Sequence, residues 1–85
     1  MRQDAVQRFN NLSLSDKCTL VTNYGKWLWW VSTEGFRISV FELEGEIVEV
    51  WYNITSRTIR GIRIPSYKDL DIHISHISLP IFETN

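Results

Sequence analysis

Residues 26–53 read KWLWWVSTEGFRISVFELEGEIVEVWYN, and this stretch decides the fold. It contains three segments rich in Trp, Val, Ile and Phe, residue types that favour β-strands, separated by two Glu-Gly pairs. A fourth segment, residues 58–64, alternates isoleucine with arginine. We therefore predict a four-stranded antiparallel meander with strands at residues 26–32, 36–42, 46–54 and 58–64.

The two connections at residues 33–35 and 43–45 determine how the strands pair. Each fits a three-residue hairpin loop, in which a type I turn is followed by glycine in the left-handed region. Two-residue loops would instead place Glu49 on the same face as Ile38 and Val40. Three-residue loops separate charge from apolar side chains better, so we expect three-residue loops.

With these loops, one face of the predicted sheet is almost entirely apolar, because register decides which side chains share a face. The residues on this face are Leu28, Trp30, Phe36, Ile38, Val40, Val48, Val50 and Tyr52. A bulge at Gly61 would add Ile59, Ile62 and Ile64, turn Arg60 and Arg63 outward and place Arg63 near Glu49. We expect helices to pack on this face, which makes Trp30 a core residue.

The opposite face of the predicted sheet combines aromatic and basic side chains. Its residues are Trp27, Trp29, Val31, Arg37, Phe41, Ile47, Trp51, Arg60 and Arg63, together with Ser39 and Glu49. A solvated antiparallel face should be mainly polar, and an apolar patch of this size exceeds what a monomer usually exposes. We therefore predict that these side chains, apart from Ser39 and Glu49, form an interaction face. The C-terminal segment, a second subunit or a ligand would cover it.

One or two helices are predicted before the sheet. Residues 2–10 place Ala5, Val6 and Phe9 on one helical face. A second helix begins after Ser13 or Ser15 as the N-cap and ends at Gly25. After Pro65, the apolar spacing fits a short helix or a strand, and both alternatives stay open. The predicted fold is one α+β domain spanning residues 1–85.

Composition restricts the class of protein. Lys plus Arg is 9 and Asp plus Glu is 10, for a formal net charge of -1, which gives no overall attraction to nucleic acid or anionic membranes. The only cysteine, Cys18, cannot form an internal disulfide, as is typical of a reducing compartment. The polar N-terminus does not resemble a signal peptide, and no apolar run reaches the roughly 20 residues that span a bilayer. We expect a cytoplasmic protein.

Candidate catalytic and metal-binding patterns are weak. His73 and His76 have the i, i+3 spacing of two metal ligands on a helix, but no motif supplies further ligands, so surface histidines are the simpler interpretation. The acidic residues Glu42, Glu44, Glu46 and Glu49 cluster at the second hairpin, and because three of the four sit at or beside the turn, a solvated hairpin tip is the simpler interpretation. The serines form neither a GxSxG nor an SxxK motif. The sequence predicts no catalytic, cofactor-binding or metal-binding residue.

The functional prediction rests on the aromatic and basic face. Trp, Phe and Arg are enriched in protein interfaces, so we expect a non-enzymatic interaction module, either a homodimer or a binder of another protein. The alternative is single-stranded nucleic-acid binding, because aromatic rings can stack on bases while arginines contact phosphates. A small hydrolase has least support, since it needs a nucleophile or a perturbed acid in a pocket.

Three short motifs resemble a family of small uncharacterised bacterial proteins of about this length. They are residues 24–28 (YGKWL), residues 48–53 (VEVWYN) and the pair Ile59 and Ile62. The resemblance covers roughly residues 9–77 and implies a cytoplasmic α+β domain. It implies no activity and no site residues.

Overall fold

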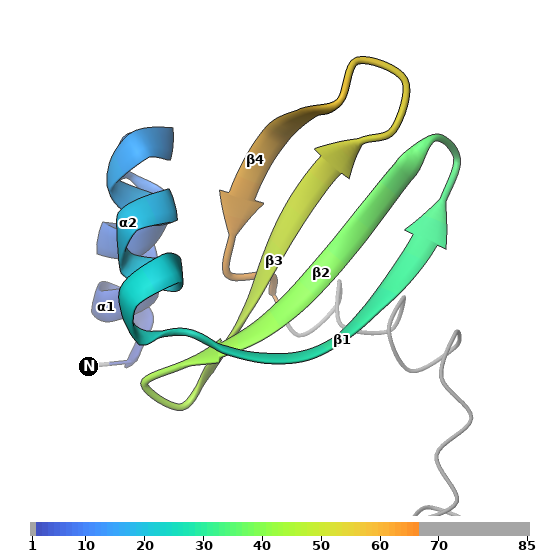
Figure 1. The fold of residues 1–85 in the computed structure, drawn as a ribbon. Coiled ribbons are helices and arrows are strands. Elements are labelled where there is room, and N and C mark those ends of the chain that lie inside the picture. Colours follow the sequence, from blue (N-terminus) through green and yellow to red (C-terminus); the bar gives the residue numbers. More distant parts are fainter. Residues whose placement is uncertain (1, 67–85) are drawn as a thin grey trace, which may run out of the picture.

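The fold was obtained as a computed structural model that describes residues 2–66 (Figure 1). Two helices, α1 (Arg2–Asn10) and α2 (Leu14–Tyr24), precede the strands β1 (Lys26–Thr33), β2 (Phe36–Leu43), β3 (Glu46–Asn53) and β4 (Thr58–Arg63). The strands form one antiparallel sheet in the order β1-β2-β3-β4. The predicted α+β fold with a four-stranded meander is confirmed. The predicted C-terminal helix or strand lies outside the described residues.

Helix α2 has local signals at both ends. Ser13 is its N-cap, and the Ser13 hydroxyl accepts a hydrogen bond of 3.1 Å from the backbone N–H of Asp16. At the other end, the N–H of Gly25 donates to the carbonyl of Val21 at 2.8 Å. A Cβ at Gly25 would lie 2.5 Å from that carbonyl oxygen, so only glycine allows this close approach.

Asn10 joins the end of α1 to the residue that follows β4. Its Nδ2 donates to the carbonyl of Ile64 at 3.1 Å, and its Oδ1 accepts from the N–H of Ile64 at 2.8 Å. The carboxamide thereby satisfies both backbone groups of one residue, as a neighbouring strand would. This contact ties the end of α1 to the end of β4.

Both tight hairpins differ from the prediction. Glu34 and Gly35 have φ values of 35° and 87°, and Glu44 and Gly45 have values of 50° and 81°. Thr33 pairs with Phe36 and Leu43 with Glu46 across these turns, so each loop has two residues rather than three. Two consecutive left-handed residues are the type I′ pattern, whose twist matches that of the strands. The predicted three-residue loops are therefore wrong.

The shorter loops change which side chains share a face. Ile38 pairs with Trp51 and Val40 with Glu49, whereas Val48 pairs with Phe41. A shift of one residue in register moves a side chain to the other face of the sheet. Ile38 and Val40 therefore point to one face, and Val48 points to the other. The predicted single core face is wrong, and apolar side chains are buried on both sides of the sheet.

The helix-side face of the sheet holds the larger apolar cluster. Its buried residues are Phe9, Val21, Leu43, Val48, Ile62 and Ile64. Phe41 and Val50 pack against this cluster from the sheet, and Cys18 packs against it from α2. The helices contact β4 and β2, and Figure 1 shows them together at one side of the sheet. The helices were predicted to cover a face containing Leu28, Ile38 and Val50; this is correct for Val50 and wrong for Leu28 and Ile38.

The far face of the sheet, opposite the helices, holds a second apolar cluster. Val31, Ile38 and Val40 form its buried centre, and Ile38 and Val40 have no exposed surface. Packed against them are Leu28, Trp29, Ile47 and Trp51. Because both faces contain fully buried aliphatic residues, the sheet is the middle of the apolar interior.

Candidate functional site

The structure divides the nine residues of the predicted interaction face. Trp29, Val31, Ile47, Trp51 and Arg63 belong to the far face, whereas Trp27, Arg37 and Phe41 belong to the helix-side face. Arg60 is an exposed extra residue of β4, because Trp51 pairs with Gly61 and Tyr52 with Ile59. The register shift beside Gly61 follows the predicted bulge. The nine side chains therefore do not form one surface.

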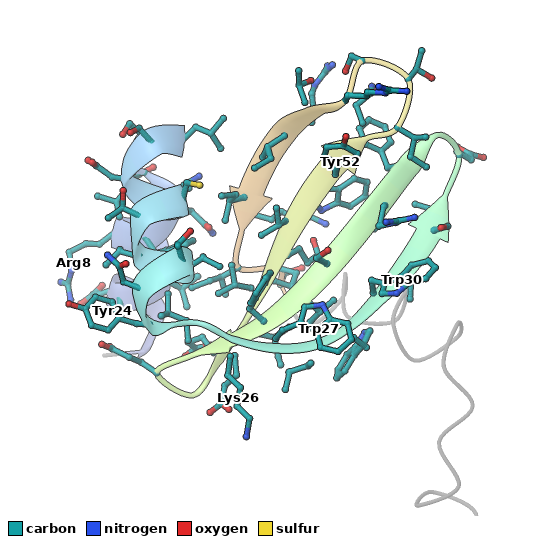
Figure 2. All side chains as sticks on the ribbon, viewed as in Figure 1. Arg8, Tyr24, Lys26, Trp27, Trp30 and Tyr52 are labelled. Atoms are coloured by element: carbon teal, nitrogen blue, oxygen red, sulfur yellow. The ribbon has the colours of Figure 1, made fainter. Side chains whose placement is uncertain are left out.

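A different aromatic surface lies along β1. The register of β1 shifts between Trp27 and Trp29, so that Trp27 pairs with Phe41 and Trp30 with Ser39. Residues 27 and 30 would point to opposite faces of a regular strand, but this bulge places both indoles on the helix-side face. Figure 2 shows them following one another along β1, apart from the helices.

Both of these indoles are accessible. Trp27 is 55% exposed and Trp30 is 48% exposed, so the prediction that Trp30 belongs to the core is wrong. The guanidinium carbon of Arg37 lies 4.7 Å from the centroid of the Trp30 ring, a cation–π arrangement. We call Trp27, Trp30 and Arg37 the β1 indole surface. Sequence reasoning missed it because the bulge places Trp27 and Trp29, which were predicted to share a face, on opposite faces, and no glycine or proline at residues 27–29 marks a bulge.

The two outer strands of the described sheet differ in how they would meet another strand. Outer strand β4 carries Arg60, Arg63 and a register shift, features that discourage pairing at an edge. Outer strand β1 also has a register shift, between Trp27 and Trp29, but it has only one charged residue, Lys26 at its start, and no proline, and its pairing is regular from Trp29 onward. Of the two edges, β1 is the one suited to accept a further strand.

A buried carboxylate lies on the far face. Glu49 has no exposed surface, and its Oε1 accepts from the Nε of Arg63 at 2.7 Å and from the Nε1 of Trp51 at 2.9 Å. The ring of Trp51 also lies 5.6 Å from the Arg63 guanidinium carbon and meets Phe36 edge-on at 5.4 Å. Charge-assisted hydrogen bonds of this kind compensate for the desolvation of a carboxylate.

Sequence reasoning identified only part of this cluster. The prediction that Arg63 lies near Glu49 is confirmed, but the inclusion of Glu49 in a solvated acidic hairpin tip is wrong. Glu42 and Glu44 are exposed and Glu46 is half-buried, so the tip is solvated without Glu49. The cross-strand arginine was the available signal that Glu49 is held inside.

The remaining candidates add no chemistry to these surfaces. Cys18 is a half-buried free cysteine on α2. His73 and His76 lie outside the described residues. Within residues 2–66, no three side chains of His, Cys, Asp or Glu gather as a metal site. None of the helices in this described part is long and apolar enough to cross a membrane.

Comparisons with protein-family models, with curated proteins and with solved structures find no match to this chain. The resemblance to small bacterial proteins therefore stays a prediction.

Proposed function

We propose that this chain is a non-enzymatic interaction module that forms a homodimer through the edge of β1 and the β1 indole surface. The observation that supports the proposal most is the pair of half-exposed indoles, Trp27 and Trp30, on one face of an outer strand with little edge protection. Indole and guanidinium groups are the side chains that contribute most at protein interfaces, and Arg37 accompanies Trp30 here.

A second copy of the chain is the partner that this geometry fits. An antiparallel pair of β1 strands, related by a two-fold axis perpendicular to the sheet, would join the two sheets into one of eight strands. The same axis would keep both sets of indoles on one face, on either side of the seam. Trp27 and Trp30 of each copy would then lose exposed apolar surface when the backbone edges pair.

Sedimentation equilibrium tests the proposal with a matched pair of variants. The wild-type chain should be a dimer at micromolar concentration, and Trp27→Ala/Trp30→Ala should shift it to monomer. Ile59→Ala is the control, because Ile59 is 36% exposed on β4, the outer strand at the other edge of the sheet. A monomeric wild-type chain, or a dimer that the double variant leaves unchanged, would refute the proposal.

Single-stranded nucleic acid is the second candidate partner, because Trp30 with Arg37 offers a ring and a cation at one place. The overall charge of -1 weighs against it. Titrating an oligonucleotide into the protein at low salt separates the two: quenching of indole fluorescence that Arg37→Met weakens would favour nucleic acid, whereas constant fluorescence removes this alternative.

A further inference from the structure

A cavity of about 480 Å³ opens at the β4 edge of the sheet, the edge away from β1. Its lining comes from the start of α2, from β4 and from one residue of β3. These residues are Leu14, Lys17, Trp51, Arg60, Gly61, Ile62 and Arg63. Three of them are basic, and no acidic residue of the described chain lines the cavity.

One of the three basic side chains is held in place from within the fold. The Nε of Arg63 is fixed by the fully buried Glu49 at 2.7 Å, while 43% of the Arg63 side chain stays exposed. Glu49 balances the charge of Arg63 only, so Lys17 and Arg60 give the cavity an excess of positive charge. A positioned guanidinium loses little conformational entropy when it binds an anion, since its geometry is set beforehand.

The absence of a side chain at Gly61 helps to keep the cavity open. Gly61 pairs with Trp51, and a Cβ built at Gly61 would meet no atom within 4 Å. Trp51 on the far face and the buried Ile62 on the helix-side face line the cavity from the two sides of the sheet. The cavity consequently has an apolar wall beside its basic groups.

We propose that this cavity binds a small molecule through a phosphate group, with Lys17, Arg60 and Arg63 contacting the phosphate oxygens. Arginine and lysine are the side chains that recognise phosphate through charge-assisted hydrogen bonds. Trp51 and Ile62 would contact the organic part of a phosphate monoester. The site lies at the edge opposite the proposed dimer seam, so it does not depend on dimerisation.

Isothermal titration calorimetry of the full chain tests the site with three probes: inorganic phosphate, adenosine 5′-monophosphate and adenosine. Saturable binding of either phosphate compound without binding of adenosine supports the proposal. If adenosine 5′-monophosphate binds more tightly than inorganic phosphate, the ligand of the cavity is an organic phosphate ester. If only inorganic phosphate binds, the ligand is the free phosphate ion. No saturable binding of either phosphate compound overturns the proposal.

Variants locate the binding. Lys17→Met and Arg60→Met should each raise the dissociation constant about tenfold, since each removes a charged contact. Gly61→Val should abolish binding by filling open space. Lys26→Met, which removes an exposed cation from β1 at the other edge, should leave the dissociation constant unchanged. Equal weakening by Lys26→Met and Arg60→Met would show general charge attraction and overturn the site.

Discussion

Glu49 of β3 and Arg63 of β4 pair directly across the sheet, with 2.7 Å between the carboxylate Oε1 and the guanidinium Nε. The carboxylate is fully buried and also accepts a hydrogen bond from Trp51, while the arginine reaches the surface beside the β4 cavity. This ion pair fixes the register of the last two strands and connects the interior of the far face to the proposed phosphate site.

The ion pair predicts a coupled loss of stability. Arg63→Met should lower the free energy of unfolding by about 2 kcal/mol, below the usual cost of breaking a buried pair because the arginine is partly exposed. Glu49→Gln should cost about 1 kcal/mol, since an amide can still accept a hydrogen bond. The double variant should lose less than the sum of the two losses, because the interaction is removed only once. Urea denaturation of the four proteins measures these differences.

Arg60→Met provides the control for this cycle. Arg60 is an exposed arginine on the same strand, and its loss should change the free energy of unfolding by less than about 0.5 kcal/mol. Strictly additive losses for Glu49→Gln and Arg63→Met would contradict a direct contribution of the ion pair to stability.

The two-residue turns predict that a substitution can stabilise the chain. Glu34 and Glu44 adopt positive φ values, which asparagine tolerates better than glutamate. Glu34→Asn and Glu44→Asn should each raise the free energy of unfolding by about 0.5 kcal/mol. Gly35→Ala should lower it by about 1 kcal/mol, because its φ of 87° strains a residue with a Cβ. Thermal denaturation followed by circular dichroism checks the direction, and a destabilising Glu34→Asn would contradict the turn assignment.

The burial of the two faces predicts a contrast between an aliphatic and an aromatic residue. Ile38→Ala should cost about 3 kcal/mol, since Ile38 is fully buried in the far-face cluster. Trp30→Ala should cost the monomer only about 1 kcal/mol, because its indole is half exposed and stacks on Arg37. Chemical denaturation at a concentration below the dimer range measures both. If Trp30→Ala lowered the free energy of unfolding more than Ile38→Ala, the result would contradict the two-residue loops and favour the register with three-residue loops, in which Trp30 is buried.

The local pattern of residues along the chain was sufficient to predict the helices, the strands and the order of the strands in the sheet. The predicted strand ends, such as 26–32 and 46–54, differ by one residue from Lys26–Thr33 and Glu46–Asn53. These predictions succeeded because strand formers and turn residues alternate clearly along the chain. The pairing of β3 with β4 was also predicted, since Gly61 marks the bulge that aligns Arg63 with Glu49.

The faces of β1 and β2 could not be predicted in the same way. The assumption that a charged residue avoids the core excluded the correct register, in which Glu49 is buried with Ile38 and Val40. A carboxylate can occupy that position because Arg63 and Trp51 satisfy it, and both partners come into place only when the strands pair. The candidate surface of Trp27 and Trp30 depends in turn on a bulge that no glycine or proline marks.

The amide hydrogens of β1 test the central claim most directly. Counting from the turn-closing pair of Thr33 and Phe36, the alternation of antiparallel hydrogen bonds directs the N–H groups of Trp30 and Ser32 away from β2, toward the proposed seam. Hydrogen exchange followed by NMR should show these two amides becoming more protected as protein concentration rises, whereas the amide of Val31, which faces β2, should change far less. Exchange of Trp30 and Ser32 that stays fast at every concentration would contradict dimerisation through β1.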